Sequence, residues 1–233
     1  MSSQQQTLSR LRGGLIVSCQ PVTGGPLDRP EIVAAFARAA ETGGARGLRI
    51  EGLANLRAVR SLTSLPIIGL VKRLDPATPI IITAKPDDVS ALADAGADII
   101  AFDAALRPGR LSTTETLANT AHQAGCLAMA DLASLDDARS ALHAGVDILG
   151  TTLSGYIGGP VPEEPDISLV AECAALPLPV FAEGRYRTPA NVRAARLAGA
   201  TAVVVGSAIT RPEHVTSWFA AAMREPLPPR AGA

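Results

Sequence analysis

Ionisable and polar side chains lie within or directly after short apolar runs at many points along this chain of 233 residues. Lys72 comes after Pro-Ile-Ile-Gly-Leu-Val, and Glu183 comes after Pro-Val-Phe-Ala. An amine and a carboxylate are groups that move protons in general acid–base catalysis. The sequence therefore predicts Lys72 and Glu183 as the catalytic residues. The other side chains at such positions are Gln20, Arg49, Glu51, Arg73, Asp103, Asp131, Thr151, Thr152, Arg185 and Ser207.

Lys72 admits two interpretations. Its aliphatic stem could line the end of a buried strand while the ammonium group meets solvent. Alternatively, apolar walls and a nearby Arg49 or Arg185 would disfavour the ammonium form and lower its pKa from about 10.4 toward neutrality. A general base or a Schiff-base amine requires such a pKa. We favour the base.

Glu183 and Asp131 also admit a structural and a catalytic interpretation. Glu183 could simply form an ion pair with Arg185, or it could act as the general acid or base at a sugar hydroxyl or ring oxygen. Asp131 follows Ala-Met-Ala, and the same two roles are open to it. Asp103 is interpreted as a structural acid and is left out of the catalytic set.

The stretch Val203-Val-Val-Gly-Ser-Ala-Ile-Thr has the pattern of an anion site. A glycine lets the backbone approach an anion, and the N–H groups and dipole of the following helical turn bind it. Gly206 and Ser207 are therefore predicted to bind a phosphate group. Gly184 follows the preceding apolar run and is expected to join them, and Arg211 could reach a phosphate or a carboxylate.

The elements that position these residues repeat along the chain. Short apolar runs bounded by Gly, Pro or Asp predict fully buried strands. Ala-rich segments with apolar residues at three- and four-residue spacing lie between them and predict outer helices. The predicted strands are residues 15–18, 47–50, 66–71, 98–102, 126–130, 147–150, 179–182 and 202–206. The predicted helices include residues 30–42, 86–95, 134–143 and 189–197.

Several predicted helices end in a variant of Ala-Gly-Ala-Asp, seen at residues 95–98, 144–147 and 198–201. The glycine permits a left-handed C-cap, and the next residues enter the following strand. About eight such units with right-handed crossovers predict an α/β fold, a single (β/α)₈ TIM barrel. The competing open sheet carries a G-x-G-x-x-G turn after its first strand, whereas this chain has Ser-Cys-Gln-Pro there.

The predicted organisation has three parts: a polar N-terminal segment at residues 1–12, a catalytic barrel at residues 13–224 and a disordered tail at residues 225–233. Barrels of this kind carry their chemistry at the carboxyl ends of the strands, which is where the polar residues fall. Trp218 and Phe219, in the last predicted helix, are expected to pack against the barrel wall.

Composition excludes several classes of function. Apolar residues make up 47% of the chain, charged residues 18%, and the formal net charge is −1, so no basic face for nucleic acid or a membrane surface is expected. No apolar run is long enough to span a membrane, and the polar N-terminus is unlike a signal peptide. The three cysteines form no paired motif, which favours the cytoplasm. The three histidines fall on predicted helices, so no metal site is predicted.

Longer motifs surround several of these strand ends. The most specific are Gly14-Leu-Ile-Val-Ser-Cys-Gln20 and Gly150-Thr-Thr-Leu-Ser-Gly-Tyr156. With shorter matches at the other strands, from about Arg12 to Met223, the chain resembles the bacterial N-acetylmannosamine-6-phosphate 2-epimerases. The resemblance implies interconversion of N-acetylmannosamine 6-phosphate and N-acetylglucosamine 6-phosphate in amino-sugar or sialic-acid catabolism. It implies a phosphorylated amino sugar as substrate and no metal or organic cofactor.

The resemblance also implies residue roles. Lys72 would remove the proton from carbon 2, and Glu183 would assist proton movement, including ring opening. The predicted substrate-binding residues are Gln20, Arg49, Asp131, Arg185 and Arg211. Inverting carbon 2 needs an open ring, a base of tuned pKa and a fixed cation for the enolate, and these residues supply them.

Other functions stay open at this point. The chain could be another phosphosugar-barrel isomerase, an aldolase or a synthase, and an aldolase would form a Schiff base on Lys72. It could also be a phosphosugar-binding protein without catalytic activity. The sequence leaves open whether the chain forms a homo-oligomer.

Overall fold

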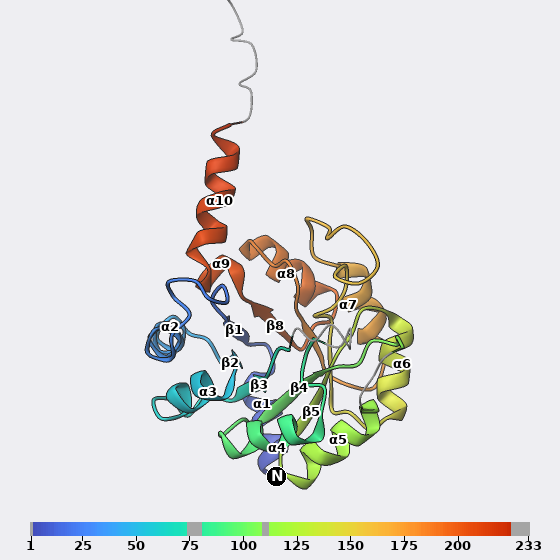
Figure 1. The fold of residues 1–233 in the computed structure, drawn as a ribbon. Coiled ribbons are helices and arrows are strands. Elements are labelled where there is room, and N and C mark those ends of the chain that lie inside the picture. The colour runs from blue at the N-terminus through green and yellow to red at the C-terminus, as the bar shows by residue number, and fades with distance from the viewer. Residues whose placement is uncertain (1, 74–80, 109–111, 225–233) are drawn as a thin grey trace, which may run out of the picture.

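Eight parallel strands close into a barrel in the computed structural model of the chain, with β8 returning to pair with β1 (Figure 1). The structure describes residues 2–73, 81–108 and 112–224. The predicted (β/α)₈ barrel is confirmed. The strands are β1 (Leu15–Cys19), β2 (Gly47–Glu51), β3 (Ile67–Leu70), β4 (Ile99–Asp103), β5 (Leu127–Asp131), β6 (Ile148–Gly150), β7 (Val180–Ala182) and β8 (Ala202–Val205).

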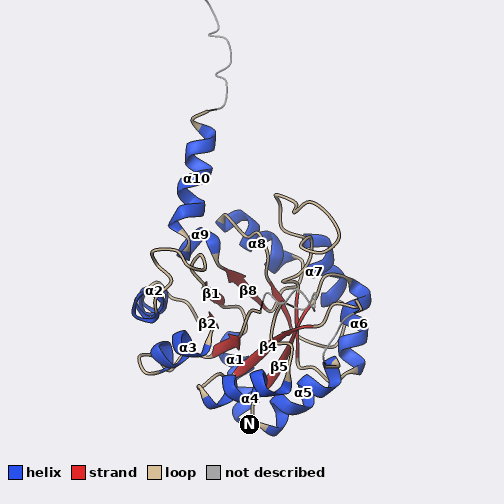
Figure 2. Cartoon of the chain, in the orientation of Figure 1, coloured by secondary structure: helices blue, strands red, loops and turns tan. Residues whose placement is uncertain are grey.

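Helices alternate with the strands and surround them, as Figure 2 shows. This arrangement is the usual result of parallel strands joined by right-handed crossovers. None of the helices in the described ranges is long and apolar enough to cross a bilayer. The helices are α1 (Ser3–Leu11), α2 (Pro30–Thr42), α3 (Leu53–Arg60), α4 (Pro86–Asp94), α5 (Thr114–Gln123), α6 (Leu135–His143), α7 (Ile167–Ala174), α8 (Pro189–Leu197), α9 (Ser207–Thr210) and α10 (Pro212–Ala222).

Side chains alternate between two apolar cores along each strand. On β2, Leu48 and Ile50 are buried in the outer core between strands and helices. Arg49 lies between them, so it points into the barrel. A second apolar cluster, which includes Ile68 and Met129, fills the barrel interior. The polar side chains at the strand ends therefore lie next to the apolar cluster that fills the barrel interior.

Helix α1 packs onto the barrel interior through its last turn. Leu11 is fully buried in the interior cluster, and Leu8 packs against the same cluster. Residues 1–12 are predicted as a polar segment, and the structure shows a helix there whose apolar face joins the core, because residues three apart share one helix face. The predicted disordered tail, residues 225–233, lies outside the described residues.

Helix α10 extends away from the barrel (Figure 1). None of its residues is buried, and Phe219 and Met223, which directly follows the helix, are 73% and 86% exposed. The prediction that Phe219 packs against the barrel wall is therefore wrong for the chain by itself. Local sequence gives α10 an apolar face but does not determine which surface covers that face.

The repeated Ala-Gly-Ala-Asp variants join neighbouring strands at the amino-terminal end of the barrel. Asp98 Oδ2 accepts a hydrogen bond from the backbone N–H of Ile67 at 2.9 Å, so the residue before β4 holds the start of β3. Asp147 Oδ2 does the same for Ala128 of β5 at 2.8 Å. Thr201 Oγ1, before β8, accepts from Val180 of β7 at 3.3 Å. The repeat therefore pairs strands β3–β4, β5–β6 and β7–β8.

We predict that Asp147→Ala lowers the free energy of unfolding by about 1–2 kcal/mol, because the N–H of Ala128 loses a charged acceptor. Urea denaturation followed by circular dichroism measures the change. The control is Asp94→Ala, which removes an exposed aspartate at the end of α4 and should change stability by less than about 0.5 kcal/mol. Equal midpoints for Asp147→Ala and the wild type would contradict the role of the repeat.

Candidate active site

A cavity of about 450 Å³ opens at the carboxyl ends of the strands. Every predicted site residue except Asp131 lines it, and Asp131 lies directly beneath, in contact with Arg49. The predicted residues on the cavity wall are Gln20, Arg49, Lys72, Glu183, Gly184, Arg185, Gly206, Ser207 and Arg211. Barrel enzymes carry their active sites at this end.

Arg49 forms the centre of the site. Its Nη2 and Nη1 donate to the two carboxylate oxygens of Asp131 at 2.6 and 3.2 Å, and its Nη1 lies 2.9 Å from Glu183 Oε2. Arg49 is 1% exposed and Asp131 is fully buried. Burial opposes the charge on Arg49, but the two carboxylates outweigh burial and raise the pKa of Arg49 above its ordinary value. Arg49 is thus a fixed cation.

Thr152 connects the two carboxylates. Its hydroxyl donates to Asp131 Oδ1 at 2.5 Å and lies 3.3 Å from Glu183 Oε2. Thr151 holds the backbone of the same glutamate, because its hydroxyl donates to the carbonyl of Glu183 and accepts from its N–H, both at 3.0 Å. The sequence identified these threonines as polar residues at a strand end without assigning them a role. The Gly-Thr-Thr motif that contains them is the sequence signal that could have indicated their role in the site.

Glu183 holds its proton unusually strongly. Burial is the main cause and, with the neighbouring charge of Asp131, raises the pKa of Glu183 from 4.5 to about 7, against the opposing effects of Arg49 and Lys72. A carboxyl group with this pKa can give or take a proton at neutral pH. The interpretation of Glu183 as a simple ion-pair partner of Arg185 is wrong, because Arg49 is the arginine that contacts it.

Lys72 lies across the cavity on the segment that follows β3. Its Nζ donates to Gln20 Oε1 at 2.7 Å, and Gln20 Nε2 in turn donates to Ser18 Oγ at 2.9 Å. The residue as a whole keeps an exposed surface, but burial of the amine, with the charges of Arg49 and Arg211, lowers the pKa of Lys72. The sequence predicts this lowering, and Arg211 takes the place proposed for Arg185 as a contributing charge.

The predicted phosphate residues lie together at the ends of β7 and β8. Gly184 has a φ of +110°, which a residue with a side chain rarely adopts. Gly206 precedes helix α9 and packs against Ser18, so a Cβ at this position would lie 3.3 Å from Ser18 Cβ. Arg211 Nε donates to the carbonyl of Gln20 at 2.6 Å, which fixes the arginine beside α9.

Arg185 holds a loop rather than the carboxylates. Its Nε donates to the carbonyl of Glu164 at 2.7 Å, its Nη1 donates to the carbonyl of Ser154, and its guanidinium lies 5.4 Å from the ring centroid of Tyr156. Arg185 thereby joins both ends of the loop between β6 and α7. Sequence spacing did not indicate these contacts, because the loop that contains Ser154 and Glu164 forms no helix or strand.

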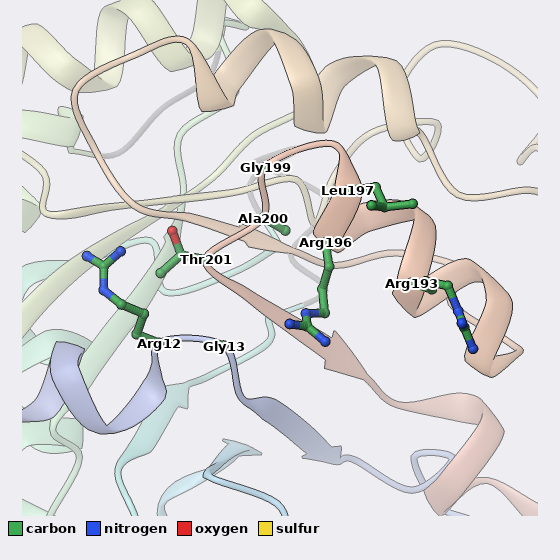
Figure 3. A pocket seen from close by; sticks show the side chains of 8 residues that line it. All are labelled: Arg12, Gly13, Arg193, Arg196, Leu197, Gly199, Ala200 and Thr201. Atoms are coloured by element: carbon green, nitrogen blue, oxygen red, sulfur yellow. The ribbon is translucent and has the colours of Figure 1, made fainter.

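A second cavity of about 430 Å³ lies at the opposite end of the barrel (Figure 3). It is bordered by residues that precede β1 and β8 and by helix α8. Its lining contains arginines but no lysine, carboxylate, histidine or cysteine. Of these two cavities, only the one at the carboxyl ends of the strands has a lysine and a carboxylate in its lining. Among the described residues, no group of three or more His, Cys, Asp or Glu side chains could hold a metal ion.

The closed barrel, with a lysine, a glutamate and an arginine gathered in its carboxyl-end cavity, defines a (β/α)₈-barrel enzyme. A family model described as “Putative N-acetylmannosamine-6-phosphate epimerase” matches residues 33–225. The chain belongs to this family of isomerases.

Individual relatives match over nearly the whole chain. A protein from Yersinia pseudotuberculosis with the name “Putative N-acetylmannosamine-6-phosphate 2-epimerase” is 52% identical over 225 residues, covering 97% of this chain and 96% of its own. One of the same name from Klebsiella pneumoniae is 52% identical, covering 98% of each. The solved structure of the N-acetylmannosamine-6-phosphate 2-epimerase from Clostridium perfringens has a TM-score of 0.88 at 36% identity, covering 92% of this chain and 95% of its own.

We predict that Glu183→Gln makes the protein more stable than the wild type at pH 8. Because the folded state raises the pKa of Glu183 from 4.5 to about 7, folding favours its protonated form, and the free energy of unfolding falls as the pH rises through that window. The glutamine variant escapes this loss, which is about 3 kcal/mol at roughly 1.4 kcal/mol per pKa unit.

Urea denaturation at pH 4 to 9 measures the difference between the two proteins. It should be small near pH 4, grow between about pH 4.5 and 7 and then stay constant. Glu163→Gln, at an exposed loop position, is the control and should follow the wild-type curve. A constant difference between wild type and Glu183→Gln across the whole range would contradict the prediction.

Proposed function

We propose that the chain interconverts N-acetylmannosamine 6-phosphate and N-acetylglucosamine 6-phosphate by removing and returning the proton on carbon 2. The observation that carries the proposal is that one cavity holds an amine of lowered pKa, a carboxyl of raised pKa and a fixed arginine. The names of the relatives support the choice of substrate. The phosphorylated amino sugar is thus the proposed ligand.

The proposed reaction starts from the open-chain aldehyde, because only there is the proton on carbon 2 acidic enough to remove. Lys72, as a neutral amine, takes this proton and becomes an ammonium, and the electron pair passes to the aldehyde oxygen as an enolate. Arg49 stabilises the enolate. Its guanidinium borders the cavity and is held in place by Asp131 and Glu183, so its positive charge is fixed close to the developing negative charge.

Glu183 moves the second proton in this proposal. With a pKa raised to about 7 it can hold a proton at neutral pH and release it in the same cycle. It serves either ring opening, at the ring oxygen, or return of a proton to the opposite face of carbon 2. Asp131 and Thr152 keep the glutamate and Arg49 in place through the contacts described above.

The phosphate group is proposed to bind at Gly184, Gly206 and Ser207, with Arg211 beside them. Backbone N–H groups at the start of α9 suit an anion. Gln20 orients Lys72 and is itself held by Ser18. Binding the phosphate far from carbon 2 holds the reacting carbon against the base and converts binding energy into rate.

A second candidate reaction is an aldol cleavage through a Schiff base on Lys72, which the lowered pKa of this amine also favours. Borohydride reduction in the presence of sugar phosphate distinguishes the two. A stable adduct on Lys72 supports the aldolase, and an unmodified lysine supports the epimerase. Tight binding of the sugar phosphate without turnover would instead indicate a binding protein.

We also propose that the chain works in the cytoplasm as a homo-oligomer. All three cysteines are free and buried, as is usual in a reducing compartment.

Helix α10 carries the exposed side chain of Phe219, and the exposed Met223 directly follows the helix. Exposed apolar side chains on a helix that projects from the barrel indicate an interaction surface. The proposed partner is a second copy of the chain, because a two-fold symmetric dimer brings the apolar surface of one α10 against the same surface of the other α10.

We predict that Lys72→Ala lowers kcat by roughly a thousandfold and abolishes exchange of the carbon 2 proton with solvent. Incubating each epimer with the enzyme in deuterium oxide and recording proton NMR spectra measures both effects. Full activity in the variant would contradict the assignment of the base.

Glu183→Gln tests the second proton transfer in the same assay. If Glu183 returns the proton to the opposite face, the variant exchanges deuterium into one epimer without forming the other. If Glu183 serves ring opening, exchange and epimerisation fall together. Unchanged rates of both would remove Glu183 from the mechanism.

We predict that replacing both Phe219 and Met223 with Asp converts an oligomer into a monomer, because a charge cannot be buried in an apolar contact without a partner. Size-exclusion chromatography with light scattering gives the mass. Leu62→Asp, which changes a 46% exposed leucine on another face, should keep the oligomer. A monomeric wild type would contradict the proposal.

A further inference from the structure

Among the described residues, five lysine and arginine side chains line the carboxyl-end cavity, and four of them are held by contacts within the protein. Arg49 is paired with two carboxylates, and Lys72 donates to Gln20. Arg185 and Arg211 donate to backbone carbonyls. The remaining cation is Arg187.

Arg187 lies in the segment between β7 and α8, and its guanidinium stacks on the ring of Trp218 at 4.8 Å from the centroid. Among the described residues, its backbone N–H donates to Asn191 Oδ1 at 3.3 Å, and its guanidinium forms no hydrogen bond or ion pair. A guanidinium stacked by its face keeps the N–H groups of its edge directed outward. Arg187 is therefore an oriented cation whose donors are available to a ligand.

Chain connectivity brings this pair to the phosphate residues. Arg187 follows Gly184 by three positions, and Trp218 belongs to α10, which begins directly after Arg211. All of them border the same cavity. Arg187 and Trp218 thus form the outer wall of the cavity beside the loops after β7 and β8.

We propose that Arg187, seated on Trp218, binds the phosphate group of the substrate from the solvent side and distinguishes phosphorylated from unphosphorylated sugars. This inference rests on the proposed function. A phosphate monoester carries close to two negative charges at neutral pH, and an arginine edge forms paired charge-assisted hydrogen bonds with its oxygens. Gly206 and Ser207 supply backbone dipoles and Arg211 supplies one positive charge, so Arg187 provides the second positive charge that balances the phosphate group.

The stacked ring makes binding directly measurable, because Trp218 is the only tryptophan in the chain. Titration with N-acetylglucosamine 6-phosphate should change its fluorescence, whereas N-acetylglucosamine at the same concentrations should not. In Arg187→Ala the phosphorylated sugar should bind roughly tenfold more weakly. Equal affinity of wild type and Arg187→Ala for the phosphorylated sugar would overturn the proposal.

Kinetics provide the second readout. Arg187→Ala should raise KM for N-acetylmannosamine 6-phosphate by roughly tenfold with little change in kcat, because the contact is equally strong in ground and transition states. Arg187→Lys, which keeps the charge but loses the planar fork, should recover part of the loss. Arg193→Ala, which removes an exposed arginine at the other cavity (Figure 3), should behave like the wild type. A fall in kcat with unchanged KM would overturn the proposal.

The two proposals fail separately. If the wild type shows no epimerisation but Arg187→Ala still weakens binding of the phosphorylated sugar, the proposed function fails and the phosphate contact stands. If the wild type epimerises the sugar and Arg187→Ala retains its KM and affinity, the phosphate contact fails and the function stands.

Discussion

The buried ion pair between Arg49 and Asp131 is the interaction on which the rest of the site depends. It joins β2 to β5 across the barrel, and both side chains are almost completely buried, so removing either partner is costly. With Arg49 held as a cation, Glu183 has a charged neighbour, and the ammonium form of Lys72 is disfavoured. The charge of Arg49 thus lowers the pKa of both groups, while burial has the largest effect on each of them.

Local pattern was sufficient to predict most of the fold. Apolar runs bounded by Gly and Pro gave the strands, and alternation around Leu48 and Ile50 directs Arg49 inward. The catalytic candidates followed from the rule that barrels carry chemistry at strand ends, and the structure brings Lys72, Glu183 and Arg49 to one cavity. The position of a polar residue relative to a predicted strand therefore predicted well whether its side chain lies at the cavity.

The contacts of individual side chains were harder to predict from the sequence than their positions in the fold. Arg185 was expected near the carboxylates, but its donors meet carbonyls of Ser154 and Glu164, residues whose place depends on the path of an irregular loop. The stacking of Arg187 on Trp218 brings together two segments that no periodicity connects. Such pairs arise from tertiary packing, and a sequence pattern carries information only about neighbours along an element.

The strand-pairing repeat at the amino-terminal end has a consequence for the cooperativity of unfolding. Asp98, Asp147 and Thr201 join strands two by two, so each pair is a natural unit of local opening. The Arg49 network at the other end contacts β5 and the end of β7, which belong to different pairs. Opening the β5–β6 pair or the β7–β8 pair alone would separate Arg49 from a buried carboxylate, so the Arg49 network couples the unfolding of these two pairs.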